Sequence, residues 1–180
     1  MLQIRRVKIV IRTLNNEYGF DETFNEGLNF IASVNNTCGK SSIISAIYYC
    51  LGFEEIIGGK GEKVLTSAFK HSIEDGVTSL QVLESFMYVE LYNGSEVITV
   101  YRTGKMENRD SRLVSIYYSD MDSINLLDTF SEDMYVHMPN SATNEKGFHT
   151  FLEKYLGLEL PFNYQVTICV CGISLVAYNF

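Results

Sequence analysis

The stretch from Val34 to Ser41, VNNTCGKS, holds the residues whose types and spacing most clearly predict a chemistry. It matches the phosphate-binding pattern G-x-x-x-x-G-K-[ST] at every fixed position except the first, where Val34 replaces glycine. Gly39 lets backbone amides approach phosphate oxygens, Lys40 supplies a charge for the β- and γ-phosphates, and Ser41 offers a hydroxyl to Mg²⁺. The stretch therefore predicts a nucleotide site with Mg²⁺ at Ser41, formed by Asn36, Thr37, Cys38, Gly39, Lys40, Ser41 and Ser42.

Such a loop needs a strand before it and a helix after it. The segment from Leu28 to Ser33 is short, mostly apolar and β-compatible, which predicts a buried strand. Residues 42–51 predict a helix ended by Gly52, which would direct its free N–H groups and positive dipole end at the phosphates. Its apolar stripe consists of Ile43, Ile44, Ile47, Tyr48 and Leu51. The alternative is a Gly-Lys turn that caps a core helix and binds no ligand.

The remaining pattern predicts an antiparallel meander beside this strand–loop–helix unit, and hence an α/β fold. Residues 2–12 alternate as in a half-buried strand, and Asn93-Gly94 between two β-rich runs predicts a hairpin. Further short strands are expected at 20–24, 113–118 and 134–138, and a helix at 147–156. The first strand contains three arginines, Arg5, Arg6 and Arg12. They are solvated edge charges, or alternatively one of them reaches the nucleotide phosphates.

Composition indicates a globular chain in a reducing compartment. The 180 residues fit one domain, and a net charge of −8 argues against a free-standing nucleic-acid binder. The four cysteines form no C-x-x-C pair and the three histidines are scattered, so we expect neither a disulfide framework nor a metal-ligand cluster. The N-terminus lacks the apolar run of a signal peptide, and the apolar stretch 166–180 is too short to span a bilayer. We therefore expect a cytoplasmic protein without membrane contact.

The chain resembles the N-terminal half of an ABC-type ATPase head of the SMC and RecF class. The resemblance is carried by Phe24–Ile31 (FNEGLNFI), Asn36–Ser42 (NTCGKSS) and the helix residues Ala46–Gly52. Within that class it is most similar to the SMC-like subunit of Lamassu-type anti-phage systems, whose heads also lack the first glycine of the loop. Matching segments are Ser33–Asn36, Tyr18-Gly19, Val82–Ser85, Arg109–Leu113, Gly147–Leu152 and Leu160-Pro161.

The resemblance extends over residues 1–165 and implies the N-terminal lobe of an SMC-like head. Residues 166–180 would then be a divergent uncharged tail. Either the tail results from a truncated or frameshifted gene, or it is a divergent buried strand that ends the domain. Such heads bind ATP and Mg²⁺ between two protomers and complete their sheet with a second lobe. That lobe carries the Walker B and signature motifs, which are not recognisable in this sequence. A half-head would leave apolar core surface exposed.

The resemblance also implies a glutamine near Mg²⁺ in the loop after the meander. The loop at 138–147 contains Asn144 and no glutamine, and Gln165 is a distant second candidate. We therefore expect an ATP-binding half-head that does not hydrolyse ATP alone and takes part in DNA sensing, DNA maintenance or anti-phage defence. Its partners would be a second head lobe or a homodimer partner, and DNA through the full assembly. The alternatives are a non-catalytic interaction module and a small self-contained P-loop kinase.

Overall fold

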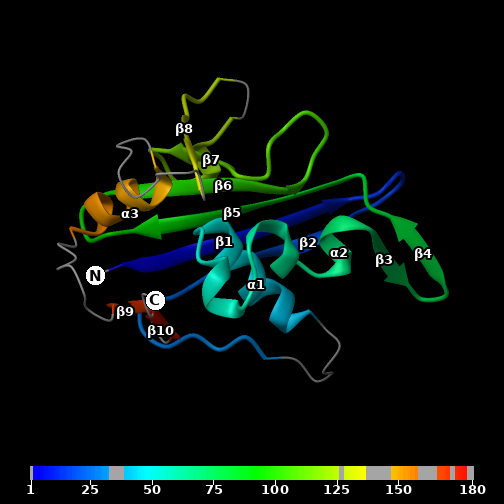
Figure 1. Cartoon of the computed structure of the whole chain (residues 1–180), viewed down its shortest axis with the longest axis horizontal. Coiled ribbons are helices and arrows are strands. Elements are labelled where there is room, and N and C mark those ends of the chain that lie inside the picture. Colours follow the sequence, from blue (N-terminus) through cyan, green and yellow to red (C-terminus); the bar gives the residue numbers. More distant parts are fainter. Residues whose placement is uncertain are drawn as a thin grey trace.

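The computed structural model describes residues 2–32, 39–125, 128–136 and 147–157, together with the backbone of 166–170 and 173–177. These residues form a mixed α/β structure around one six-stranded sheet, in which every neighbouring pair of strands is antiparallel (Figure 1). The strands, in their order across the sheet, are β2 (Glu17–Thr23), β1 (Gln3–Arg12), β5 (Glu84–Tyr92), β6 (Val97–Lys105), β7 (Leu113–Tyr117) and β8 (Glu132–Tyr135).

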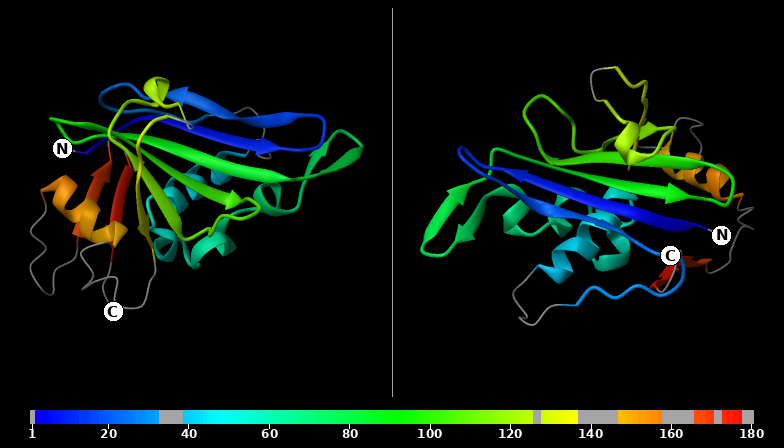
Figure 2. Two further views of the ribbon diagram at one scale, coloured as in Figure 1. Left: turned by 90° about the horizontal axis from the view of Figure 1, so that it is seen from above. Right: turned by 180° about the vertical axis from the view of Figure 1, so that it is seen from behind.

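The helices cover one face of this sheet (Figures 1 and 2). Helix α1 (Lys40–Cys50) packs on β1, β5 and β6, and α3 (Phe148–Leu156) covers the same face near the β5–β6 turn. The short elements between them along the chain are η1 (Glu54–Ile57), η2 (Gly61–Val64), α2 (Ser67–Lys70) and η3 (Met121–Ser123). Of these, η3 lies on the opposite face of the sheet, where Met121 packs with Tyr88 and Tyr101. Two hairpins lie outside the sheet, β3 (Ser72–Asp75) with β4 (Thr78–Gln81) and β9 (Val166–Val170) with β10 (Ile173–Ala177).

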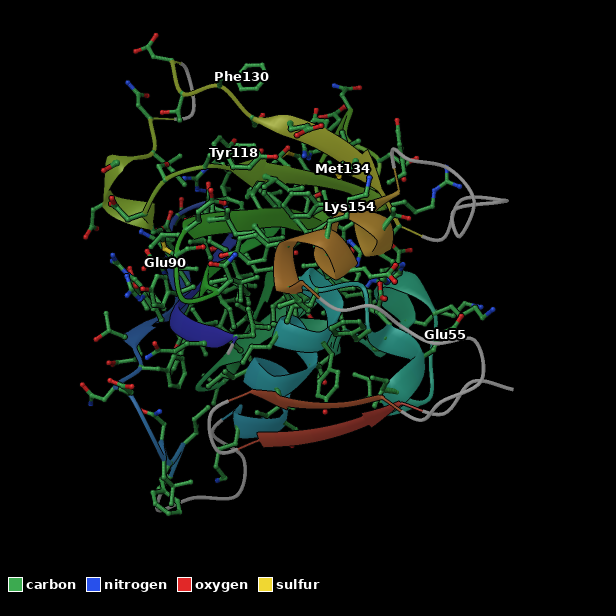
Figure 3. The ribbon with its side chains drawn as sticks, turned by 90° about the vertical axis from the view of Figure 1, so that its left-hand side faces the viewer. Glu55, Glu90, Tyr118, Phe130, Met134 and Lys154 are labelled. Atoms are coloured by element: carbon green, nitrogen blue, oxygen red, sulfur yellow. The ribbon has the colours of Figure 1, made fainter. Side chains whose placement is uncertain are left out.

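The main core lies between the sheet and the helices, and a smaller aromatic cluster covers the other face. The predicted alternation in β1 is confirmed, since Val7, Ile9 and Ile11 face the helices and Val10 faces the aromatic cluster. The side chains of that cluster are Val10, Phe86, Tyr88, Tyr101, Tyr117 and Met121. In Figure 3 Phe130, which is 80% exposed, projects away from the sheet on the side opposite α1.

Local predictions for the meander are confirmed. The Asn93-Gly94 pair forms the β5–β6 turn, where Asn93 Oδ1 accepts hydrogen bonds from the amides of Ser95 and Glu96, both at 2.9 Å. The strands predicted at 20–24, 113–118 and 134–138 correspond to β2, β7 and β8, with residues 137 and 138 outside the described ranges. The predicted second helix is α3, ended by Gly157 in the left-handed conformation.

The buried strand predicted at Leu28–Ser33 is not observed in its described part, residues 28–32. These residues pair with no described strand, and Leu28 and Phe30 are 64% and 82% exposed. Local hydrogen bonds compete with strand pairing here, because the Asn29 side chain bonds to the backbone of Asn25 and Gly27 and closes a turn. Within the sheet, β1 is paired with β2 and β5. The described strands therefore form an antiparallel sheet and not the parallel sheet that usually carries a phosphate loop.

The described backbone of the tail forms two strands, β9 and β10, paired with each other in a separate two-stranded sheet. The two interpretations of this tail stay predictions. Among the described residues, no helix is long and apolar enough to cross a membrane.

Candidate functional site

The described part of the predicted nucleotide loop lies at the start of α1. Gly39 is the N-cap residue and adopts φ 71° and ψ 10°, and its carbonyl oxygen accepts a hydrogen bond from the amide of Ile43 at 3.1 Å. This left-handed backbone is strained for any residue with a side chain, although a Cβ at Gly39 would meet no atom within 4 Å. The glycine is therefore required by backbone conformation and not by packing. Asn36, Thr37 and Cys38 lie outside the described residues.

The first turn of α1 brings three of the predicted site residues together. Lys40 is half-buried, Ser41 is exposed, and Ser42 is half-buried with its Oγ 3.4 Å from Thr66 Oγ1. Among the described residues of this turn none is acidic, so the turn itself carries no negative side chain against the partial positive charge of the helix N-terminus. The arrangement suits an anion, because first-turn amides have no acceptor within their own helix.

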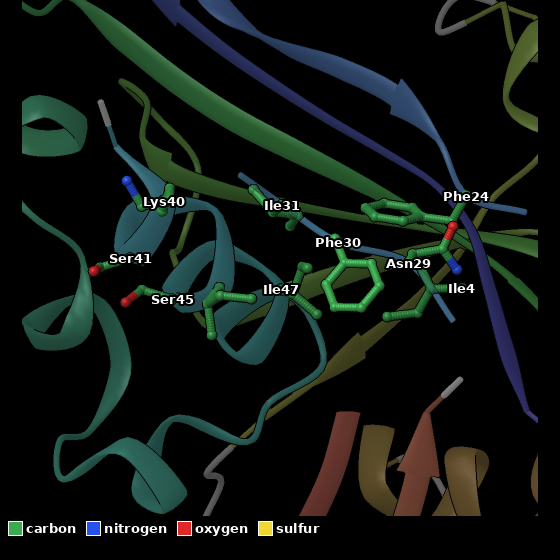
Figure 4. Close-up of a pocket in the computed structure, with 10 residues that line it drawn as sticks. Ile4, Phe24, Asn29, Phe30, Ile31, Lys40, Ser41, Ser45 and Ile47 are labelled. Carbon is green, nitrogen blue, oxygen red and sulfur yellow. The ribbon is translucent and has the colours of Figure 1, made fainter. Parts of the chain in front are cut away.

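A pocket of about 490 Å³ adjoins this turn, between α1 and the segment 24–31 (Figure 4). Its polar end is formed by Lys40, Ser41 and Ser45, and the apolar side chains lie farther along the helix. The other lining residues are Ile4, Phe24, Asn29, Phe30, Ile31, Ile44 and Ile47. The predicted apolar stripe of α1 is thus divided, because Ile43 is buried in the core whereas the half-buried Ile44 lines the pocket. Ile47 belongs to the core and also lines the pocket.

Asn29 shapes the backbone beside this pocket. Its Oδ1 accepts a hydrogen bond from the Asn25 amide at 2.9 Å, and its Nδ2 donates to the carbonyl oxygens of Asn25 and Gly27 at 2.8 and 3.2 Å. Gly27 has φ 92° in the same turn. The Asn-Glu-Gly turn before the loop is therefore closed by an asparagine side chain, for which the sequence pattern indicated no role.

The opposite end of α1 is held by a buried ion pair that the sequence pattern did not predict. Arg102 Nη1 lies 2.6 Å from Glu54 Oε1, and both side chains have 0% exposure. Arg102 also donates to the carbonyl oxygens of Tyr49 and Ser111, and its guanidinium lies 3.8 Å from the centre of the Tyr49 ring. Burial raises the pKa of Tyr49 to about 12. The only signal in the sequence was a charged residue inside the β-rich run VITVYRTG.

The three arginines of β1 are engaged on the sheet, but β1 lies between β2 and β5, so they are not charges on an edge strand. Arg6 pairs with Asp21 at 2.7 Å and with Asp122 at 2.6 Å, which lowers the pKa of Asp21. Arg12 pairs with Glu17 at 3.0 Å and with Glu84 at 3.3 Å. The guanidinium of the third, Arg5, lies 3.9 Å from the centre of the Tyr92 ring.

Two further predictions concern metal ligands. Asn144 and Gln165, the candidates for the side chain near Mg²⁺, both lie outside the described residues. Within the part of the chain that the structure describes, no three histidine, cysteine, aspartate or glutamate side chains come close enough to hold a metal ion. Ser41, the predicted Mg²⁺ ligand, is exposed on the first turn of α1, and its role stays a prediction.

Comparison of the chain with protein-family models, with curated proteins and with solved structures finds no match. Support for a function therefore comes from the residues of this chain and their geometry.

Proposed function

We propose that this chain binds a nucleoside triphosphate, ATP, together with Mg²⁺ at the N-terminus of α1. The observation that carries the proposal is the left-handed Gly39 followed directly by Lys40 and Ser41 on the first turn of a helix of 11 residues. Lys40 would neutralise the β- and γ-phosphates, Ser41 would hold Mg²⁺, and the first-turn amides would bind phosphate oxygens. Bound Mg²⁺ would supply charge neutralisation across the phosphates.

We further propose that the chain acts as one lobe of an SMC-like ATPase head and depends on a second lobe or a second copy for hydrolysis. The exposed Leu28 and Phe30 support this, because they leave apolar surface uncovered beside the nucleotide site. The net charge of −8 gives this chain no overall basic footprint, so any contact with DNA would be made through the full assembly. DNA sensing, DNA maintenance or anti-phage defence is the setting that the resemblance suggests.

The test is a titration of the chain with Mg-ATP by calorimetry, comparing wild type with Lys40→Ala. Removing a charged phosphate partner costs about 1.5–3 kcal/mol, so the Kd should rise about tenfold or more. Lys63→Ala is the matched control, because Lys63 is an exposed lysine on η2, outside the loop. Circular dichroism of each variant verifies the fold. Equal Kd values for wild type and Lys40→Ala would contradict the assignment.

A second candidate function is an interaction module that keeps the loop but binds no nucleotide. Two observations favour it: Val34 replaces the first glycine of the pattern, and the pocket beside α1 is mainly apolar. Absence of Mg-ATP binding by the folded wild-type chain would support this alternative.

A further inference from the structure

We propose that Arg102 is a positioning residue for the nucleotide site, acting through Tyr49 and Glu54 on the orientation of α1. The inference rests on the proposed function, since it concerns where Lys40 and Ser41 lie. Arg102 is in β6, in register with Met87 of β5 and Val114 of β7, so it lies on a central strand of the sheet. Its side chain contacts α1, η1 and the loop before β7.

The contacts of Arg102 meet at one end of α1. Its guanidinium stacks on the Tyr49 ring and donates to the Tyr49 carbonyl oxygen, while Tyr49 Oη donates to the carbonyl oxygens of Thr103 and Ser111 at 2.8 and 3.0 Å. Cys50, the next residue, is fully buried with its Sγ 3.5 Å from the carbonyl oxygen of Val100. The last turn of α1 is thereby fixed to β6 at several points.

Glu54 completes the arrangement from the segment that follows α1. It begins η1, and its carboxylate receives Arg102 Nη1 at 2.6 Å with both side chains fully buried. A planar guanidinium donates in fixed directions, so it defines the relative orientation of the groups that accept from it. Apolar residues of similar volume could fill the same space without that directionality.

Helix geometry links this end of α1 to the nucleotide site. Lys40 and Tyr49 are nine residues apart in one helix, which corresponds to about 14 Å along its axis. A tilt of about 5° around the Tyr49 end would move Lys40 by about 1 Å, a displacement that matters for groups meant to bind phosphate. Arg102 therefore stabilises the placement of a site that it does not itself contact.

The test separates positioning from stability by removing the ion pair in two ways. Arg102→Met alone removes the guanidinium paired with the buried Glu54 carboxylate, so this variant should lose much of its stability. Arg102→Met combined with Glu54→Leu removes both charges, and its thermal midpoint should return close to that of wild type. If Arg102 positions the site, the double variant should still bind Mg-ATP about tenfold or more weakly than wild type.

The matched control is Glu55→Leu combined with Lys60→Met, which removes the neighbouring ion pair at 3.0 Å. Its side chains are 56% and 78% exposed, and Glu55 lies at the surface in Figure 3. The control should bind Mg-ATP with the wild-type Kd. A double variant at Arg102 and Glu54 with wild-type stability and wild-type Kd would overturn the proposal.

A second variant and a second measurement test the role of Arg102 independently of the double variant. If the double variant does not fold, Arg102→Lys keeps the charge opposite Glu54 but loses the planar donor and its stacking on Tyr49. This variant should retain the fold and weaken Mg-ATP binding, and an unchanged Kd would overturn the proposal.

The amide NMR chemical shifts of Ile43–Ile47 report on how α1 sits against the sheet without nucleotide and should change in Arg102→Lys and in the double variant but not in the Glu55 and Lys60 control. Unchanged shifts would overturn the proposal. If wild type binds no Mg-ATP, the proposed function fails while this readout still tests the positioning of α1.

Discussion

His149 Nε2 lies 2.9 Å from the carbonyl oxygen of Gly52, which joins α3 to the end of α1 across 97 residues of sequence. The His149 ring also stacks on Phe53, with ring centres 6.0 Å apart and planes at 28°. Gly52 has φ 72°, and a Cβ placed on it would lie 2.8 Å from His149 Nε2 and 2.9 Å from Val136 Cγ1. Gly52 is therefore required both by backbone conformation and by the close approach of α3.

Gly52→Ala should destabilise the protein more than the same substitution at a glycine that is required only for its left-handed backbone conformation. The left-handed backbone costs about 1–2 kcal/mol for a residue with a Cβ, and the overlap with His149 and Val136 adds to that cost. Urea unfolding should show a loss of about 2–4 kcal/mol in the free energy of unfolding.

Gly58→Ala is the control for this prediction. Gly58 has φ 87° at the end of η1, and a Cβ there would meet no atom within 4 Å. This variant should lose only the conformational part, about 1–2 kcal/mol. Equal losses at the two positions would show that the contact with α3 contributes nothing.

Phe30→Asp should reduce the binding of an apolar fluorescent dye without unfolding the protein. Phe30 lines the pocket and is 82% exposed, so its removal costs little packing and we expect a stability change within about 0.5 kcal/mol. Val77→Asp, on the fully exposed tip between β3 and β4, is the control and should leave dye fluorescence unchanged. Equal dye fluorescence in wild type and Phe30→Asp would show that the pocket is not the exposed apolar site.

Alkaline pH should destabilise the fold through its buried tyrosines. Burial raises the pKa of Tyr49 and of Tyr101 to about 12, above the unfolded value of about 10. The unfolded chain thus loses these protons first, so the contribution of the two tyrosines to the free energy of unfolding is constant below pH 10 and falls as the pH rises from about 10 to about 12. Each raised pKa unit corresponds to about 1.4 kcal/mol.

Urea unfolding at increasing pH, with tyrosinate absorbance recorded in parallel, checks this prediction. Tyr49→Phe removes one of the groups and should make the fall in stability shallower. A free energy of unfolding that stays constant from pH 10 to pH 12 would contradict the prediction.

Features that depend on neighbouring residues could be predicted from the sequence alone. The Asn93-Gly94 turn, the alternation of β1 and the apolar face of α3 follow from hydrogen bonds and periodicities encoded within a few residues. Gly39 likewise belongs to a local pattern, and its left-handed conformation explains why glycine occupies that position.

Tertiary structure decided what depends on residues far apart in the chain. Residues 28–32 have the composition of a strand, but they pair with no described strand, and the Asn29 side chain bonds to the backbone of Asn25 and Gly27 instead. Arg102 and Glu54 are 48 residues apart, so no local pattern could show that they share a buried site. The sequence determined the local chemistry at the start of α1, and only the packed sheet determined how that helix is held, because burial and pairing arise from the whole fold.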